Sequence, residues 1–434
     1  MNQAKLFKEF FRYTALNICG MIGLSCYILA DTFFVSSGLG TNGLAALNLA
    51  IPIYSFIHGS GLMLGMGGAT RYSLLRGQGK YAQMDRVFTC TVCLAFLFSA
   101  AFMFLGGFCA GEITSLLGAN RDVYDMARTY LQMILLFSPA FIANNILLCF
   151  VRNDGSPGLT MTAMLAGSLS NILLDYLLIF PLRMGILGAV MATGLAPLIS
   201  MGILSVHRLK GRNHFHLRKI GISLEPTLDI LSLGIPSLVT EVASGIVMIV
   251  FNGIILSLQG NVGVAAYGVV ANLSLVTASV YTGIAQGMQP LASRAHGSGD
   301  RDAEKKILHY AMFVMLSASI CIYTVFFLAA DPIAGIFNSE HHELLQQIAV
   351  TGLKVYFTAL PFAGFNIVIA MYFTALGRAL PAQAVSLARG FLIIIPAAFF
   401  LAYLLGMKGV WLSYPLTEGV VALMGGVLLC KSNR

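Results

Sequence analysis

Charge is scarce in this chain of 434 residues, of which only 10% are Asp, Glu, Lys or Arg, and tryptophan occurs once. A soluble domain carries about 25% charged residues, so this composition argues against a soluble enzyme, a nucleic-acid-binding protein and a disordered scaffold. Hydrophobic residues make up 57% of the chain. They come in blocks of about 20, each long enough to cross a hydrocarbon layer of about 30 Å. The sequence therefore predicts an integral membrane protein.

Motifs for catalysis and metal binding are absent as well. The GQGK segment at 77–80 lacks the preceding glycine of a phosphate-binding loop, and no HExxH or GxSxG motif occurs. The CxxC of Cys90 and Cys93 has no second pair at zinc-site spacing. We therefore expect that the protein is not an enzyme and has neither a cofactor nor a disulfide framework. Any energy that it uses must come from an ion gradient or from the gradient of a substrate.

Twelve apolar segments are predicted to span the membrane, which makes the fold class all-α. Most Lys and Arg residues of the connecting segments, Arg152 among them, fall on the side of the two termini, and this bias predicts that both termini are cytoplasmic. The predicted spans are 13–37, 44–70, 87–110, 124–151, 157–182, 185–207, 229–258, 263–292, 307–330, 346–375, 381–405 and 409–430.

The longest polar stretch lies near the middle of the chain. It predicts a basic cytoplasmic linker at 208–228 between a first six-helix lobe, 1–207, and a second, 229–434. His207, His214 and His216 occur in and beside this stretch without a neighbouring carboxylate or thiolate. We therefore expect a solvated loop here and no metal site.

An internal repeat relates the two lobes. LGTNGLAALNLAIP, which begins at Leu39, aligns with QGNVGVAAYGVVAN, which begins at Gln259, and a nearly constant offset also pairs Gly67 with Gly287 and Pro139 with Pro361. Because each lobe has an even number of spans, the lobes should be related by a pseudo-two-fold axis along the membrane normal. Such paired repeats are typical of alternating access, with the substrate site at the interface.

Four polar residues fall at similar depth in the first lobe. Asp31 and Asp175 are carboxylates inside predicted spans, where a charge costs at least about 2.5 kcal/mol and invites a functional explanation. Asn171 lies one helical turn from Asp175, and Thr193 lies at a comparable height in the next span. This oxygen-rich group suits Na⁺ or a proton. Alternatively, these side chains only hydrogen-bond neighbouring helices.

Two further acids lie near the predicted midplane of the second lobe. Glu241 and Glu418 could attract a cationic substrate or pair with Lys354 or Arg389, and we favour a substrate role for Glu241 and an ion pair for Glu418. Other polar residues of the spans could line a cavity or bridge helices: Asn144, Asn145, Gln286 and Gln289.

Several runs of this sequence resemble the multidrug and toxic compound extrusion (MATE) family, over essentially the whole chain. They are ADTFFVSSGLGTNGLAALNLAIP at 30–52, SNILLDYLLIF at 170–180, MGILGAVMATGLA at 184–196 and GIAQGMQPLASRAHGSGD at 283–300. For prokaryotic members, the resemblance implies a first-lobe cation site at Asp31, Asn171, Asp175 and Thr193. Glu241 matches a helix 7 glutamate of other branches. The aspartate that accompanies it in one branch is not evident in FNIVIAMYFTALGR, which favours the first lobe.

The resemblance implies a secondary multidrug efflux transporter that exports cationic amphipathic compounds in exchange for Na⁺ or H⁺. We expect a monomeric, multi-pass protein of the cytoplasmic membrane, with small organic cations and membrane lipids as its partners and no nucleic acid. Asn144, Asn145, Glu241 and Gln286 are the predicted substrate-binding residues. One alternative is a flippase of the same two-lobe plan for a lipid-linked precursor, which would need a basic cavity. Another is an uncoupled channel or membrane sensor.

Overall fold

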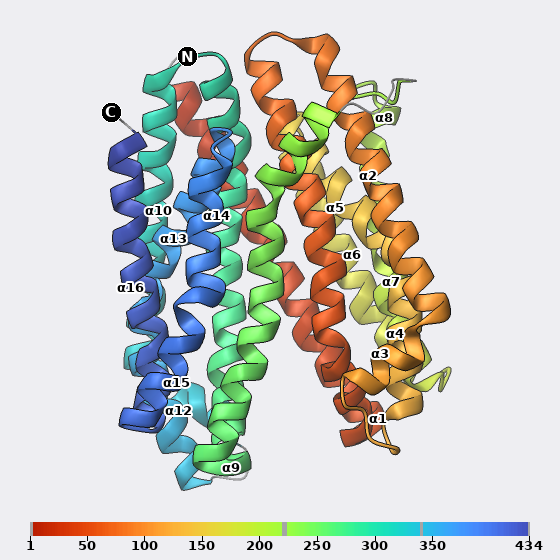
Figure 1. The fold of residues 1–434 in the computed structure, drawn as a ribbon, viewed down its shortest axis with the longest axis vertical. Helices are drawn as coiled ribbons and strands as arrows, with labels where there is room; N and C mark the ends of the chain where they lie inside the picture. Colours follow the sequence, from red (N-terminus) through yellow and green to blue (C-terminus); the bar gives the residue numbers. More distant parts are fainter. Residues whose placement is uncertain (1–2, 219–223, 339–341, 433–434) are drawn as a thin grey trace.

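The structure is a computed structural model that describes residues 3–218, 224–338 and 342–432, and the regular structure of these residues is helical (Figure 1). The helices of the first half are α1 (Gln3–Gly77), α2 (Tyr81–Phe108), α3 (Ala110–Leu116), α4 (Tyr124–Leu136), α5 (Ser138–Asn153), α6 (Pro157–Ile179), α7 (Gly185–Leu204) and α8 (Val206–Leu209). Those of the second half are α9 (Leu224–Gly297), α10 (Arg301–Leu328), α11 (Ala330–Phe337), α12 (Glu343–Tyr356), α13 (Leu360–Ala375), α14 (Ala379–Leu387), α15 (Ile394–Leu405) and α16 (Met407–Ser432).

Helices α1 and α9 are each broken at one glycine. Gly40 has φ 67° and ψ −158°, and Gly260 has φ 61° and ψ −156°, a conformation that only glycine adopts without strain. These are the residues that the repeat aligns with each other. A straight helix of 75 residues would be about 110 Å long, far more than one bilayer crossing. The short loops expected between the first two spans of each half are therefore single-residue breaks.

Other predicted spans are also interrupted, in two cases just before a proline, which lacks a backbone donor. Helices α4 and α5 meet at Phe137 with a bend of 47°, just before Pro139. In the second half, a 3₁₀ turn at Phe357–Ala359 precedes Pro361, and a π turn at Ala388–Leu392 separates α14 from α15. Each interruption lies inside a segment that hydropathy predicts as one span.

Within the described ranges, nine helices are long and apolar enough to cross a membrane, or ten if the bent pair α4 and α5 counts as one span. Large apolar side chains on the outside of the bundle are open to the surroundings: Phe96 and Phe108 are each 77% exposed and Tyr403 is 88% exposed. Such a surface would be a liability in water and is appropriate to lipid. The protein is thus a multi-pass membrane protein.

Two large hydrophobic cores divide the helices into two groups, which Figure 1 shows side by side. One core draws almost entirely on residues 35–215 and the other on residues 251–421. However, each core also includes residues from the beginning of the first helix of the other half. Leu6, Phe10 and Tyr13 at the start of α1 pack in the core of the second half, and Ile230 near the start of α9 packs in the core of the first. The ends of α1 and α9 therefore tie the two halves together.

The described part of the predicted linker packs on the first half of the chain. His207 is only 2% exposed, and its Nε2 lies 2.8 Å from Asp154 Oδ2, so the prediction of a solvated loop is wrong for this residue. Phe215 is buried against the rings of Phe88 and Phe150. Lys219, also assigned to the linker, lies outside the described residues. The partner of His207 and His214 is Asp154 and that of His216 is Asp85, both remote in sequence, and no cluster suited to a metal ion occurs in the described ranges.

Candidate functional site

A cavity of about 390 Å³ lies between the two halves. It is lined by residues of α1, α5, α6 and α7 from the first half and of α9, the helices α12 to α16 and the π turn between α14 and α15 from the second. All four residues predicted to bind substrate line it: Asn144, Asn145, Glu241 and Gln286. Its wall is mainly apolar with a few polar groups, which is typical of a site for small organic molecules.

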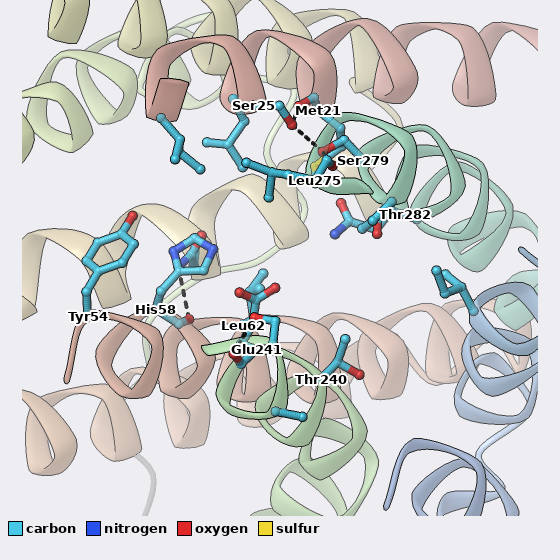
Figure 2. A pocket seen from close by; sticks show the side chains of 18 of the residues that line it. Met21, Ser25, Tyr54, His58, Leu62, Thr240, Glu241, Leu275, Ser279 and Thr282 are labelled. Atoms are coloured by element: carbon cyan, nitrogen blue, oxygen red, sulfur yellow. Dashed lines mark hydrogen bonds between the residues drawn. The ribbon is translucent and has the colours of Figure 1, made fainter. Parts of the chain in front are cut away.

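Glu241 lies on α9 beside aromatic residues of α1. Figure 2 shows Tyr54, His58 and Glu241 on one side of the cavity and Ser25 and Ser279 on the other. The Tyr54 and His58 rings stack with centroids 5.7 Å apart, and Tyr54 is close enough to Glu241 for an electrostatic interaction. Among the described residues, Glu241 has no ion-pair partner. An unpaired carboxylate beside aromatic rings is a suitable environment for an organic cation.

The amides of the cavity are partly engaged by protein groups. Asn145 Nδ2 donates to the His58 carbonyl oxygen at 3.4 Å and lies 3.2 Å from His58 Nδ1. Gln286 accepts a hydrogen bond of 2.6 Å from Arg152. Asn144 has a buried carbonyl oxygen without a partner. Asn144 therefore offers a buried acceptor that no described residue occupies.

The four predicted cation-site residues lie together in the first half. The carboxyl groups of Asp31 on α1 and Asp175 on α6 lie close enough to share a proton in a hydrogen bond. With its amide oriented to satisfy both neighbours, Asn171 donates to Asp175 Oδ2 at 3.0 Å and accepts from the Thr193 backbone N–H at 3.3 Å. Thr193 also lines the cavity. Asn171 thus lies between Asp175 and the wall residue Thr193, so the carboxyl pair is separated from the cavity by one residue.

The chemistry of this group fits a cation or a proton. Asp31 Oδ1 and Asp175 Oδ1 are buried and have no hydrogen-bond partner in the described structure. Two carboxylates in contact cannot both carry a full negative charge unless a cation or a proton lies between them. The unpartnered oxygens, with the Asn171 amide and the Thr193 hydroxyl beside them, are hard oxygen ligands of the kind that Na⁺ prefers.

Glu418 forms the expected ion pair in the second half. Arg389 donates to Glu418 Oε1 through Nη2 at 2.8 Å and through Nε at 3.2 Å. Asn366 Nδ2 donates to Glu418 Oε2 at 2.7 Å. The second candidate partner, Lys354, instead lies over the Phe327 ring, 5.7 Å from its centroid. The interpretation of Glu418 as an ion-pair residue is confirmed.

Arg152 does not lie in a solvated loop, and this part of the sequence interpretation is wrong. It is 1% exposed, lines the cavity and belongs to α5. Its Nη1 donates to Asn17 Oδ1 at 3.0 Å and to Gln286 Oε1 at 2.6 Å. In the sequence, a single arginine at the end of an apolar block looks like a charge that sets the membrane topology. The two partners of Arg152 come from distant helices and leave no mark in the nearby sequence. The one feature that could have indicated a buried role is that Arg152 stands alone, with no second basic residue nearby.

Buried hydrogen bonds join the two halves at the end of the molecule where α1 begins and α16 ends (Figure 1), and we call this the closed end of the cavity. Gln289, which does not line the cavity, accepts from Asn153 Nδ2 at 3.0 Å and donates to Thr70 at 3.0 Å. With the bond from Arg152 to Gln286, these contacts connect α5 and α1 to α9. Hydrogen bonds between buried partners therefore join the two halves at the closed end of the cavity.

Backbone contact between α1 and α9 completes this closure. A Cβ atom at Gly234 would overlap the carbonyl oxygen of Met63, and one at Gly67 would overlap that of Ile230. Gly77 and Gly297 meet in the same way, since a Cβ at either one would overlap the backbone of the other helix. We call Gly67, Gly77, Gly234 and Gly297 the glycine seam. The absence of side chains lets the two helices approach more closely than other residues would allow.

The profile of the MatE family matches residues 18–177 and 236–400 of this chain. This chain belongs to the MatE family. It is 24% identical to Multidrug export protein MepA of Staphylococcus saprophyticus over 423 residues, which cover 97% of this chain and 93% of MepA. Structures of MatE-type proteins share its fold.

One is described as the outward-facing conformation of a multidrug resistance MATE family transporter, with a TM-score of 0.90, 22% identity and 99% of this chain and 97% of that chain covered. Another is a transporter from Pyrococcus furiosus whose description reports reverse polarity of its binding pocket, with a TM-score of 0.90, 21% identity and the same coverage. At these identities the likeness demonstrates the fold.

Proposed function

We propose that this MatE-family chain is a secondary active multidrug efflux transporter, which exports cationic amphipathic compounds in exchange for Na⁺ or H⁺. The observation that carries the proposal is the contact between the Asp31 and Asp175 carboxyl groups, one residue away from a cavity between the two halves. Similarity to MepA supports export of drugs. The unpaired Glu241 in the cavity supports a cationic substrate.

The proposed architecture has twelve spans in two six-helix lobes. Counting α1 and α9 as two spans each, because each is broken at a glycine, supports this number. We further propose that the protein acts as a monomer in the cytoplasmic membrane with both termini in the cytoplasm. In the proposed cycle the lobes rock about the cavity, so that the contacts of the glycine seam must separate when the site opens to the cytoplasm.

Exchange requires that cation and drug compete. A cation bound between Asp31 and Asp175 would draw the two carboxylates together and alter the α1 and α6 contacts beside the cavity. Tyr54 is near enough to interact electrostatically with both Asp31 and Glu241, and it offers a route by which the two sites influence each other. Linkage then requires that the drug weaken cation binding by the same factor by which the cation weakens drug binding.

The test is efflux of a fluorescent organic cation from proteoliposomes, with Na⁺ and pH gradients imposed separately. Efflux driven by one gradient is the expected result and identifies the coupling ion. Absence of a response to either gradient, in liposomes shown to be tight, would contradict coupled antiport and favour a lipid substrate.

A further inference from the structure

Arg152 is a buried cation that the proposed exchange cycle does not use. It is 1% exposed and lines the cavity at its closed end. No carboxylate forms an ion pair with it in the part of the chain that the structure describes. A buried charge without a counter-charge is costly, since its desolvation is offset only by neutral dipoles. A charge retained at such a cost inside a ligand cavity calls for an explanation.

The guanidinium group is only partly satisfied by its neighbours. Nη1 donates to the Asn17 and Gln286 side chains, which are neutral acceptors. Nη2 faces only sulfur atoms, with Met66 Sδ at 3.3 Å and Cys149 Sγ at 3.7 Å. Sulfur is a weak acceptor. Nε is buried and has no partner. The Nε and Nη2 edge, which is the edge that can bind a carboxylate through two parallel hydrogen bonds, therefore lacks a strong acceptor.

We propose that Arg152 forms an anion-accepting subsite at the closed end of the cavity, which binds the carboxylate of an organic compound that also carries a positively charged group. The proposal rests on the proposed function, since it concerns the ligands of the same cavity. Glu241 supplies the complementary negative charge for the cationic group of such a ligand. A carboxylate on the ligand would replace the sulfur contacts and neutralise the buried charge.

Arg389, the other arginine of the cavity wall, is a poor candidate for this role. Its Nε and Nη2 already donate to Glu418, whose second oxygen accepts from Asn366. A ligand carboxylate would have to displace a buried carboxylate that is held by three hydrogen bonds. At Arg152 it would displace only thioether and thiol sulfur. The difference in available acceptors assigns the anion subsite to Arg152.

The experiment compares two dyes that differ in a single charge. One is a rhodamine with a free carboxylate, which is a zwitterion, and the other is the methyl ester of the same dye, which is only a cation. Binding of both to the purified full-length protein is measured by fluorescence polarisation, and their transport is measured in proteoliposomes. The variants are Arg152→Gln, Arg152→Lys and, as the matched control on the other arginine of the wall, Arg389→Lys.

The unmodified protein should bind the free acid at least as tightly as the ester. Arg152→Gln should weaken binding of the acid by about tenfold or more, as expected for a lost charge-assisted hydrogen bond, and should change binding of the ester less than about twofold. Arg152→Lys should recover part of the binding of the acid. Arg389→Lys should not discriminate between the two dyes. Together these results would establish the subsite.

Equal losses for both dyes in Arg152→Gln would overturn the proposal and reduce Arg152 to a contact between the two halves. So would a protein that binds the ester and rejects the acid, a result that needs no variant and therefore does not depend on whether the variants fold. Failure of the proposed function has a different signature: both dyes would bind with the predicted selectivity, and neither would cross the membrane in response to an ion gradient.

Discussion

The carboxyl group of Asp31 on α1 lies within hydrogen-bonding reach of that of Asp175 on α6. Each is buried, and each keeps one oxygen without a partner. In the proposed exchange cycle, the pair holds a single positive charge between two helices that pack against the cavity, which neutral polar residues could not do.

Removing one charge of this pair should uncouple efflux from the ion gradient. In Asp175→Asn the site loses the second negative charge that holds the cation, so gradient-driven efflux in proteoliposomes should fall to the level of empty liposomes. Because Asn fills the same volume and can still bond Asn171, the protein should elute as a folded species. Asp125→Asn, a change at an exposed position on α4, is the control. Gradient-driven efflux that persists in Asp175→Asn would refute the assignment.

Glu241 should determine affinity for cationic compounds. Glu241→Gln removes the unpaired negative charge of the cavity wall, and we expect the KM for an organic cation to rise about tenfold, equivalent to about 1.4 kcal/mol. The exposed Glu112→Gln on α3 should leave KM unchanged. The measurement is the concentration dependence of initial efflux rates. An unaltered KM in Glu241→Gln would assign cation recognition to another group.

The ion pair of Glu418 and Arg389 should act on stability. Glu418→Gln leaves the Arg389 charge buried without its counter-charge, which costs about 3–5 kcal/mol, so the melting temperature in detergent should fall. Replacing both residues by methionine removes both charges and should recover most of the loss. The measurement is the fraction of protein that stays monodisperse after heating. A double variant less stable than Glu418→Gln would contradict this account.

Closure of the cavity should depend on the glycine seam. In Gly234→Ala the new methyl group would meet the Met63 carbonyl oxygen and push α1 and α9 apart, so this closed arrangement should become less populated. Cys149, which is buried in the cavity, should then react faster with a maleimide that is applied from the side of the termini, in a background where it is the only cysteine. Gly426→Ala on α16, where a Cβ meets nothing, is the control. Equal labelling rates in both variants would exclude this role for the seam.

Asp154 should make stability depend on acid pH. Burial disfavours its charged form, but hydrogen bonds from His207, Tyr72 and the His214 backbone outweigh burial and hold the pKa of Asp154 below its ordinary value. A lowered pKa contributes stability that is complete above the ordinary value of about 3.9 and is lost as the pH falls through the folded-state value. Asp154→Asn should therefore destabilise the protein at neutral pH, and this difference should shrink below about pH 4. The measurement is thermal melting of the unmodified protein and of Asp154→Asn over this pH range. A difference in stability that stays constant with pH would contradict this role of Asp154.

Features set by local composition could be predicted from the sequence. Hydropathy located the spans, because the bilayer selects for apolar length, and the repeat identified Gly40 and Gly260 as equivalent positions before their matching backbone breaks were seen. Helix depth brought Asp31 and Asp175 to one level, and the structure brings their carboxyl groups together. Their role in coupling remains a prediction.

Features set by contacts between distant segments could not be predicted. Arg152 and His207 both resemble ordinary loop residues, because nothing local to either one reveals a partner. Arg152 is buried only because Asn17 and Gln286 reach it from other helices, and His207 only because Asp154 does. Such pairings depend on how the two halves and the linker pack, and the hydropathy of a segment does not predict that packing.

The exchange of ends between the two cores has a consequence for biogenesis. Leu6, Phe10 and Tyr13 are synthesised before the second half, yet most of the residues that they pack against belong to it. The start of α1 must therefore wait in the nascent chain until the second half has been inserted, and its docking is among the final steps of folding. A ribosome that stalls near the linker would release a first half whose opening helical turns have no core to join, and this exposed segment would mark the incomplete product for quality control.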